Sequence, residues 1–115
     1  MRDYQQLAFW QRSHQLTFKI YKATKTFPKE EIYGLTSQMR RSSSSVPTNI
    51  AEGCGRMSNA ELKRFLTIAA GSLSELNYQL ILSKDLQYLS ETLFKELLDE
   101  TIQIRKMIHR YYEKI

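Results

Sequence analysis

The side chains that could perform chemistry are few, and they are scattered along the 115-residue chain. It has two histidines, His14 and His109, and a single cysteine, Cys54. A di-iron centre in a helical bundle requires Glu-x-x-His pairs, but Gln11 and Lys106 stand three residues before the two histidines. No histidine or other base is close to Cys54 in the sequence, so nothing indicates an activated thiol. We therefore expect no metal, no cofactor and no enzymatic activity.

Two segments rich in small residues resemble reactive motifs only in outline. Serines fill positions 42–45, and their hydroxyls are potential phosphorylation sites and weak nucleophiles. In a helix, however, small residues allow close packing, and serine hydroxyls bond back to carbonyls one turn earlier. The run Gly53-Cys54-Gly55 lacks the preceding strand and the Gly-Lys-Ser/Thr ending of a phosphate-binding loop. We interpret both segments as structural.

Polar and charged residues recur beside these small residues at helical spacing. An unpaired charge next to a core is costly, so such residues usually occur in paired networks. We expect a network that fixes the helix register or a subunit contact; the alternative is a ligand site. The residues concerned are Arg40, Arg41, Asn49, Glu52 and Glu75.

Basic residues exceed acidic ones, and the excess favours polyanionic partners. Seventeen Lys and Arg against twelve Asp and Glu give a formal net charge of +5. Clustered cations contact nucleic-acid phosphates, although an ordinary solvated face is the alternative for each cluster taken alone. The candidates are Arg12, Lys19 and Lys22 in the first helix, Lys106, Arg110 and Lys114 in the last, and Arg56, beside Lys63 and Arg64, near a helix start.

Hydrophobic periodicity divides the chain into four helical stretches. The first is expected over about residues 4–26. The second is expected to begin at Pro28 and to carry Ile32 in its core stripe. Pro47 lies inside this second pattern, where it should remove one backbone hydrogen bond and kink the helix. The expected core stripe of the first helix is Phe9, Leu16, Ile20, Ala23 and Phe27.

The remaining two helices have clear start signals. Ser58 and Glu61 have the spacing of a capping box, and Ser90 is a suitable N-cap for the last helix. Gly71 falls in the middle of the third helix, where we expect a close helix contact to explain it. Short connections between long helices imply antiparallel neighbours. The sequence thus predicts one all-α domain over residues 1–115, an antiparallel up-down-up-down four-helix bundle.

The first helix also has a second apolar face. A helix in a monomeric bundle needs only one such face, so we expect the second to be covered by another subunit. The expected oligomer interface consists of Leu7, Trp10, His14, Phe18 and Tyr21.

Localisation follows from what the sequence does not contain. The first residues have no apolar stretch of the secretory type, and no segment approaches the ~18 apolar residues of a membrane span. A lone cysteine fits a reducing compartment. We expect a cytoplasmic protein with no membrane partner.

Several motifs together resemble a known bacterial family. They are Tyr33-Gly34-Leu35, Gln38-Met39-Arg40-Arg41, residues 46–53 (VPTNIAEG), Gly55-Arg56 and residues 69–76 (AAGSLSEL). The combination resembles the four-helix-bundle family named for intervening sequences of large-subunit ribosomal RNA, and the likeness covers nearly the whole chain. Residues 42–45 are more polar than the alanine-containing stretch expected there. The positions that match the family pattern are Arg40, Arg41, Asn49, Glu52, Gly53, Gly71 and Glu75.

The resemblance implies a small all-α protein that assembles as a homopentameric ring. It also implies a relation to the accessory variability determinants of diversity-generating retroelements, which are basic pentamers that bind nucleic acid and a reverse transcriptase. The family name describes where some of the genes lie and not an activity. We therefore predict a non-catalytic, RNA- or DNA-binding homo-oligomer. The alternative is a protein-interaction scaffold whose basic faces only keep it soluble, with a protein partner such as a reverse transcriptase.

Overall fold

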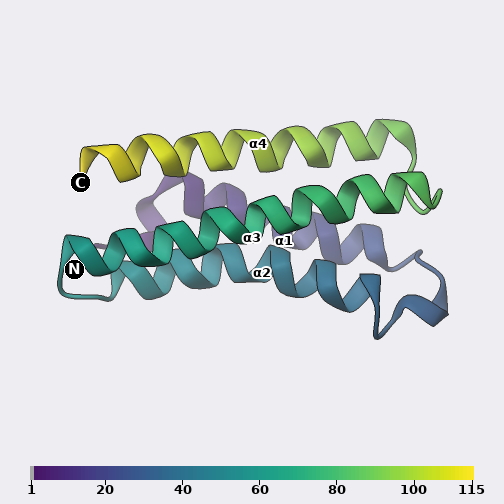
Figure 1. Ribbon diagram of the computed structural model, residues 1–115, viewed down its shortest axis with the longest axis horizontal. Helices are drawn as coiled ribbons and strands as arrows, with labels where there is room; N and C mark the ends of the chain where they lie inside the picture. Colours follow the sequence, from purple (N-terminus) through teal and green to yellow (C-terminus); the bar gives the residue numbers. More distant parts are fainter. Residues whose placement is uncertain (1) are drawn as a thin grey trace.

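The computed structural model describes residues 2–115, and within them every regular element is helical. Consecutive helices lie side by side, and the chain reverses direction at each connection (Figure 1). The prediction of an all-α four-helix protein is confirmed. The elements are the 3₁₀ turn η1 (Tyr4–Gln6), α1 (Ala8–Thr24), the 3₁₀ turn η2 (Lys29–Glu31), α2 (Leu35–Cys54), α3 (Asn59–Asp85) and α4 (Glu91–Lys114).

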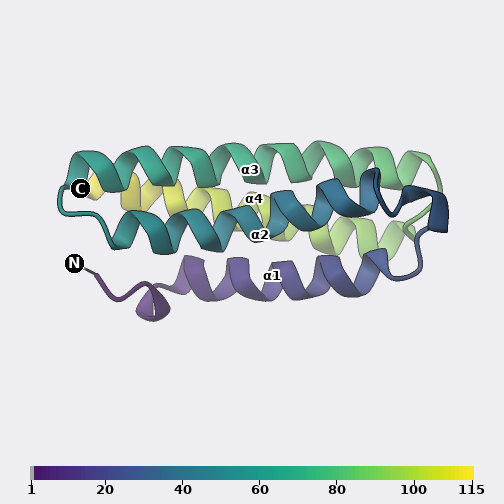
Figure 2. The same cartoon turned by 90° about the horizontal axis from the view of Figure 1, so that it is seen from below.

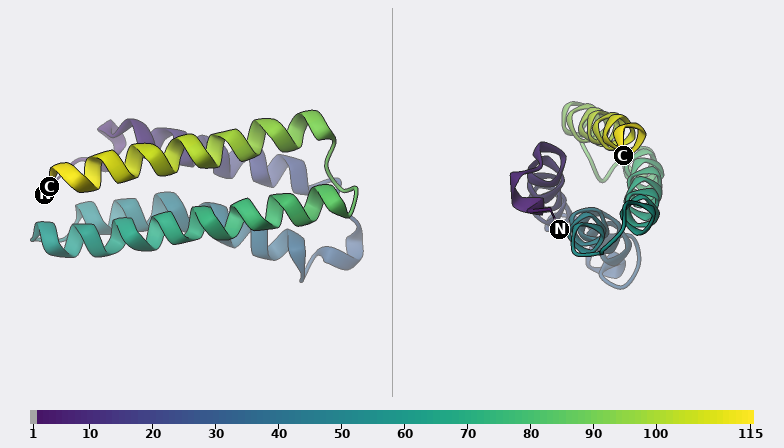
Figure 3. Two further views of the ribbon diagram at one scale, coloured as in Figure 1. Left: turned by 45° about the horizontal axis from the view of Figure 1, so that its top comes forward. Right: turned by 90° about the vertical axis from the view of Figure 1, so that its left-hand side faces the viewer.

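Each helix contacts two others, so the four enclose a common core. α1 packs against α2 and α4, and α3 packs against α2 and α4. Seen from below, α2 lies between α1 and α3, and α4 lies behind them (Figure 2). The end-on view shows the four helices around a shared axis (Figure 3). The contact between α2 and α3 is the most extensive of the four, and that between α1 and α4 is the least.

Helical periodicity explains which side chains enter the core. The five residues expected on the core face of α1 are all buried. In α3 the buried stripe follows the expected spacing of three and four residues. Phe94 in α4 is also buried, although the periodicity did not single it out. The α3 stripe consists of Leu62, Phe65, Leu66, Ala69, Leu73, Leu76 and Leu80.

Local capping fixes where α3 and α4 begin. The Ser58 side chain accepts a hydrogen bond from the Glu61 amide at 3.1 Å, and Ser90 accepts one from the Leu93 amide at 3.2 Å. Both predicted N-caps are confirmed. The predicted start of α1 is wrong, because the Asp3 side chain caps a short 3₁₀ turn and Leu7 is extended. The α-helix therefore begins only at Ala8.

The start of α2 also differs from the prediction. Ile32 is 57% exposed and lies outside the helix, so its predicted place in the core stripe is wrong. Glu31 acts as a remote cap instead: its Oε1 accepts from the Leu35 amide at 3.1 Å, and its Oε2 accepts from the Tyr88 hydroxyl at 2.9 Å. The hydrogen bond to Glu31 raises the pKa of Tyr88. At Gly34, an added Cβ would lie 2.7 Å from Glu31 Oε1, so only glycine leaves this carboxylate in place.

Pro47 lies inside α2, and the helix continues through it. Because proline has no amide hydrogen, the Ser43 carbonyl loses its usual helical partner. The Thr17 hydroxyl lies 3.0 Å from this carbonyl and also 3.0 Å from the Ser13 carbonyl of its own helix. Trp10 Nε1 donates to the Pro47 carbonyl at 3.2 Å. α1 therefore supplies hydrogen-bond donors where Pro47 removes a backbone hydrogen bond from α2. The kink itself stays a prediction.

Small polar residues line the contact between α2 and α3. Ser42 donates to Gln79 Oε1 at 2.7 Å, and the Ser45 and Ser72 hydroxyls are 2.9 Å apart. Ser42 also lies 3.2 Å from the Met39 carbonyl, as expected for serines in a helix. Among the described residues, no buried side-chain polar atom lacks a partner. The serine run is thus structural, because it allows close approach while its hydroxyls stay hydrogen-bonded.

The two helical glycines have different surroundings. Gly53 is buried, and an added Cβ would lie 2.9 Å from the Phe65 Cβ and 3.0 Å from Leu62 Cδ1. Gly71 is exposed, and an added Cβ would meet nothing within 4 Å. The prediction that Gly71 marks a close helix contact is therefore wrong for this chain on its own, and Gly53 is the glycine that such a contact requires.

Candidate nucleic-acid interface

Two of the predicted phosphate ligands are engaged within the bundle. Arg12 in α1 donates twice to Glu100 in α4, with Nε–Oε1 2.8 Å and Nη2–Oε2 3.0 Å. The hydrogen bonds to Glu100 raise the pKa of Arg12 above its ordinary value. Lys19 in α1 lies 3.3 Å from Glu96 of α4. These pairs join the two helices that have the least extensive contact, and they balance both cations internally.

Arg56 is held in a charged cluster between α2 and α3. It lies 3.7 Å from Glu52 and 3.9 Å from Glu61, and its guanidinium is 4.8 Å from the Phe65 ring centroid. Arg64 approaches the same ring at 4.4 Å and pairs with Glu61 at 3.1 Å. The hydrogen bond from Arg64 lowers the pKa of Glu61. The two arginines thus share one carboxylate and one aromatic ring, and with Glu52 the formal charges of the cluster cancel.

The predicted cations of α4 are in a different situation. Lys106, Arg110 and Lys114 are exposed and follow one another at four-residue spacing. In the part of the chain that the structure describes, none of the three takes part in an ion pair. Successive turns of α4 therefore carry three uncompensated charges on one side.

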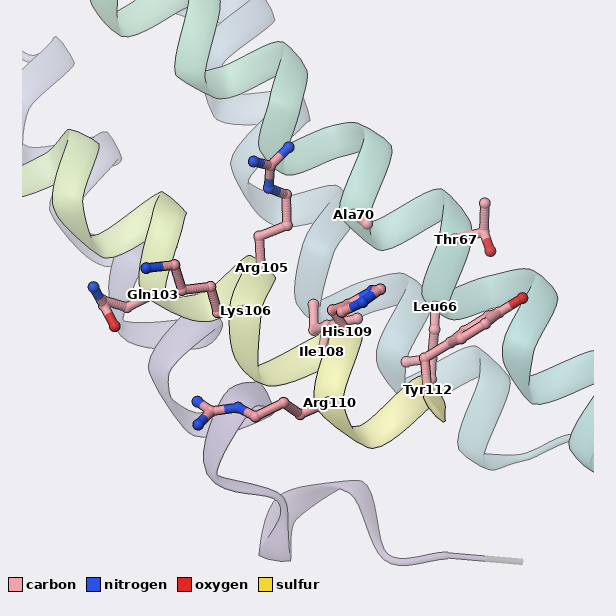
Figure 4. A pocket seen from close by; sticks show the side chains of 10 residues that line it. All are labelled: Leu66, Thr67, Ala70, Gln103, Arg105, Lys106, Ile108, His109, Arg110 and Tyr112. Carbon is pink, nitrogen blue, oxygen red and sulfur yellow. The ribbon is translucent and has the colours of Figure 1, made fainter. Parts of the chain in front are cut away.

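A groove lies beside this stripe, between α3 and α4. Its volume is about 820 Å³, and Leu66, Thr67 and Ala70 of α3 form one wall. The α4 wall includes Lys106 and Arg110 of the stripe. In Figure 4 the Arg105 side chain extends from α4 toward α3, whereas those of Lys106 and Arg110 extend away from α3. No lining residue is acidic.

The groove residues that were not selected as candidates from the sequence include one cation, one histidine and one tyrosine of α4. Arg105 adds a further cation to the wall and donates to the Ser74 hydroxyl at 3.3 Å. His109 lies 2.6 Å from Glu113 one turn later. Tyr112 contributes an aromatic face, with Lys63 Nζ 5.0 Å from its ring centroid. Arg105 was detectable as the neighbour of Lys106, but the approach of α3 that makes the groove was not.

The predicted polar network is not assembled as one unit. Arg40 reaches α1, where it donates to the Thr24 hydroxyl at 2.9 Å. Asn49 donates to the Ser45 carbonyl and hydroxyl at 2.8 and 2.9 Å. Arg41, Glu52 and Glu75 are all exposed, and Glu52 contacts only Arg56 among the charged groups. The α2–α3 contact is held by neutral hydroxyl and amide groups instead, because these can be buried without the cost of desolvating charge.

The residues predicted as an oligomer interface divide into two sets. Leu7 and Trp10 are partly buried and pack against the core of their own chain. His14, Phe18 and Tyr21 lie further along α1 and face outward to different degrees. Their use in assembly stays a prediction, but part of the apolar face is already covered within the protomer.

The structure has three further properties of interest. Among residues 2–115, no three His, Cys, Asp or Glu side chains come together in a group that could hold a metal ion. Cys54 is buried, and burial raises the pKa of its thiol. None of the described helices is both long and apolar enough to cross a membrane.

The protein is thus a small four-helix bundle with a basic groove. Comparisons with known proteins identify the family to which it belongs. The sequence pattern of the 23S rRNA-intervening sequence protein family matches residues 5–110, so the chain belongs to that family. A crystal structure of a protein of unknown function from Bacteroides thetaiotaomicron, of the S23 ribosomal protein family, superposes with a TM-score of 0.82. That match is 21% identical, covers 91% of this chain and 98% of the other, and supports the fold alone. No match was found among curated proteins.

Proposed function

We propose that the protein is a non-catalytic nucleic-acid-binding protein that contacts phosphates along α4. The observation that carries this proposal is the exposed row Lys106, Arg110 and Lys114, which forms no ion pair with any residue of 2–115. Such cations contribute most to the free energy of binding a polyanion, because no intramolecular ion pair must first be broken. Family membership is compatible with this function, although the family name describes the location of some genes and not an activity.

The adjoining groove extends the same surface. Arg105 and Lys106 line it together with the hydrophobic side chains of Leu66 and Ile108. Leu66 and Ile108 are buried core residues, so the exposed cations are the groups of this groove that a phosphate backbone can contact. The role proposed for the protein is therefore binding, with the α4 side chains acting as positioned donors to phosphate oxygens.

Binding to labelled structured RNA and duplex DNA, measured on purified nuclease-treated protein, tests the proposal. The variant Lys106→Gln/Arg110→Gln should bind at least tenfold more weakly, because each lost phosphate contact removes part of the counterion-release term. The matched control is Lys29→Gln/Lys95→Gln, which removes the same formal charge from exposed positions away from the groove. Equal weakening in both variants would show only a non-local charge effect. No binding by the unaltered protein at low salt would overturn the proposal and favour a protein-interaction scaffold.

We also propose that copies of the chain assemble into a ring, which the family resemblance predicts to be a homopentamer with up-down-up-down protomers. The exposed apolar residues Ile68, Tyr78 and Ile81 on α3 support a second contact surface. A ring would also bring the α4 rows of several protomers together and multiply their charge. Native mass spectrometry measures the number of subunits directly; a monomer across the micromolar range would contradict the ring.

A further inference from the structure

The outward face of α1 carries a row of aromatic side chains in mutual contact. The rings of Trp10 and His14 are stacked, with centroids 5.1 Å apart and planes 10° from parallel. His14 in turn meets Phe18 edge-to-face at 5.1 Å. Phe18 is 59% exposed and Tyr21, one turn further, is 43% exposed. Such exposure of rings on a single helix face is unusual for a surface that only meets water.

Cations border this aromatic row. Lys19, Lys22 and Lys25 line the same shallow hollow as His14 and Phe18, and its volume is about 700 Å³. No acidic residue lines the hollow. Lys19 forms an ion pair with Glu96, whereas Lys22 and Lys25 form no ion pair within the described residues.

The opposite border of the row is also cationic. The Arg40 guanidinium carbon of α2 lies 4.8 Å from the Tyr21 ring centroid. Arg40 is fixed there because it donates to the Thr24 hydroxyl at 2.9 Å and to the Tyr21 carbonyl at 3.3 Å. Aromatic rings between two cationic borders form a strip that is apolar along its middle and positive on both sides.

We propose that this strip binds unpaired bases of a single-stranded nucleic acid, which stack on His14, Phe18 and Tyr21 while their phosphates contact Lys22 and Lys25. The proposal rests on the proposed function and names its substrate class as single-stranded. Stacking requires a base with an exposed π-face and tolerates any base. The bases of a duplex are already stacked on one another, so they cannot stack on protein rings. The run from His14 to Lys25 measures about 16 Å at 1.5 Å per residue, room for about four or five stacked nucleotides.

A second copy of this chain is the competing occupant. A two-fold pairing of this face with itself would bring Lys22 and Lys25 against their own equivalents without a carboxylate among the lining residues. A ring contact joins two different faces, so the covering face of the neighbouring protomer would have to be acidic to match these lysines. A polyanion meets no such repulsion. Charge complementarity therefore favours a nucleic acid, and the oligomeric state is measured in the same experiment.

The single tryptophan provides the readout. Trp10 stacks on His14, so bases that bind beside it should quench its emission. Titrations would use a short oligo(dT), a duplex of the same length, and inorganic polyphosphate as a polyanion without bases. The variant Phe18→Ala removes an exposed ring, and Tyr33→Ala, at a residue 93% exposed in the turn before α2, is the matched control.

We expect oligo(dT) to quench Trp10 and polyphosphate to quench it little. Phe18→Ala should weaken oligo(dT) binding about tenfold, within the usual contribution of one stacked base, and leave duplex binding unchanged. Tyr33→Ala should behave like the unaltered protein. Lys22→Gln/Lys25→Gln should weaken oligo(dT) binding and flatten its salt dependence.

Three outcomes would overturn the inference. Equal binding by Phe18→Ala and the unaltered protein would show that the rings do not stack with bases, even if the α4 groove still binds duplex. Dissociation of an oligomer by Phe18→Ala would assign the strip to a second copy. Failure of every nucleic acid to bind would instead remove the proposed function itself. Circular dichroism of each variant shows whether it is folded.

Discussion

Two contacts within the bundle hold helices together by different means. α2 and α3 approach closely through glycine, serine and neutral hydrogen bonds such as Ser42–Gln79. α1 and α4 meet over a smaller area and are joined by the ion pairs Arg12–Glu100 and Lys19–Glu96. The first contact depends on shape and tolerates no added volume. The second depends on charge. The cations that form its ion pairs would otherwise be available to a ligand.

This contrast separates structural cations from those available for binding. Counting lysines and arginines along the sequence treats Arg12 and Lys106 as equivalent. The fold makes them different, because Arg12 is 2.8 Å from a carboxylate and Lys106 faces solvent beside a groove. The set of cations without an internal ion pair is therefore smaller than the sequence indicates, and three of them follow one another on α4.

The largest effect is expected from added volume in the α2–α3 contact. Gly53→Ala places a Cβ 2.9 Å from the Phe65 Cβ, a contact that requires the helices to separate. We expect a loss of about 1–3 kcal/mol in the free energy of unfolding, the usual cost of overpacking. Gly71→Ala is the matched control, and it should add about 0.5–1 kcal/mol because alanine favours a helix at an open position. Urea denaturation measures both; a neutral or stabilising Gly53→Ala would contradict tight packing here.

The next effect concerns the donor that compensates Pro47. Thr17→Val keeps the shape but removes the hydroxyl that lies 3.0 Å from the Ser43 carbonyl. Leaving that carbonyl unpaired should cost about 1–2 kcal/mol. Pro47→Ala restores an amide donor, so Thr17→Val should cost less in that background. A double-mutant cycle by urea denaturation measures the coupling, and strictly additive effects would show that Thr17 does not serve the proline.

A smaller effect is expected in the α1–α4 contact. Arg12→Gln breaks an ion pair whose side chains are 42% and 20% exposed. Exposed pairs usually contribute about 0.2–1 kcal/mol, and salt screens them. The difference in melting temperature from the unaltered protein should therefore shrink as salt is raised. A salt-independent loss as large as that of Gly53→Ala would mean that the two contacts do not differ as described.

The smallest effect is a pH dependence of stability that arises from the hydrogen bond between Tyr88 and Glu31. The pKa of Tyr88 is raised in the folded state from its ordinary value of 10.0. The stability from this bond is thus fully present below about pH 10 and is lost as pH rises through the folded-state pKa. Tyr88→Phe should melt slightly lower at neutral pH and should not show this loss at alkaline pH. Identical alkaline profiles for both proteins, measured by thermal melts, would exclude the contribution.

The features that the sequence predicted correctly are local ones. A serine three residues before a glutamate determines the start of α3 through a single side-chain cap, and apolar spacing alone selects Leu16 or Leu73 for the core. The same reasoning found the α4 row, since Lys106 and Arg110 need only helical geometry to share a face. In each case the relevant partners stand within a few turns of one another.

The features that it missed depend on relations between distant segments. Glu100 stands 88 residues from Arg12, and only the register of α1 against α4 brings the two together. Glu31 caps α2 because Tyr88, from the connection between α3 and α4, holds the other carboxylate oxygen. Gly71 and Gly53 look alike in sequence, and only the crossing of α2 over α3 distinguishes the exposed one from the buried one. Helix register is set by the whole core, so single-helix patterns do not reveal it.

The measurement that tests the account most directly is the salt dependence of nucleic-acid affinity in two variants with the same formal charge. Lys106→Gln/Arg110→Gln removes cations of the α4 groove, and Arg12→Gln/Lys19→Gln removes cations of the α1–α4 contact. The account predicts that the first variant lowers the slope of log affinity against log salt by about two, nearly one per lost phosphate contact, while the second leaves it unchanged. Equal loss of slope in both variants would contradict the division of the charges into structural and binding sets.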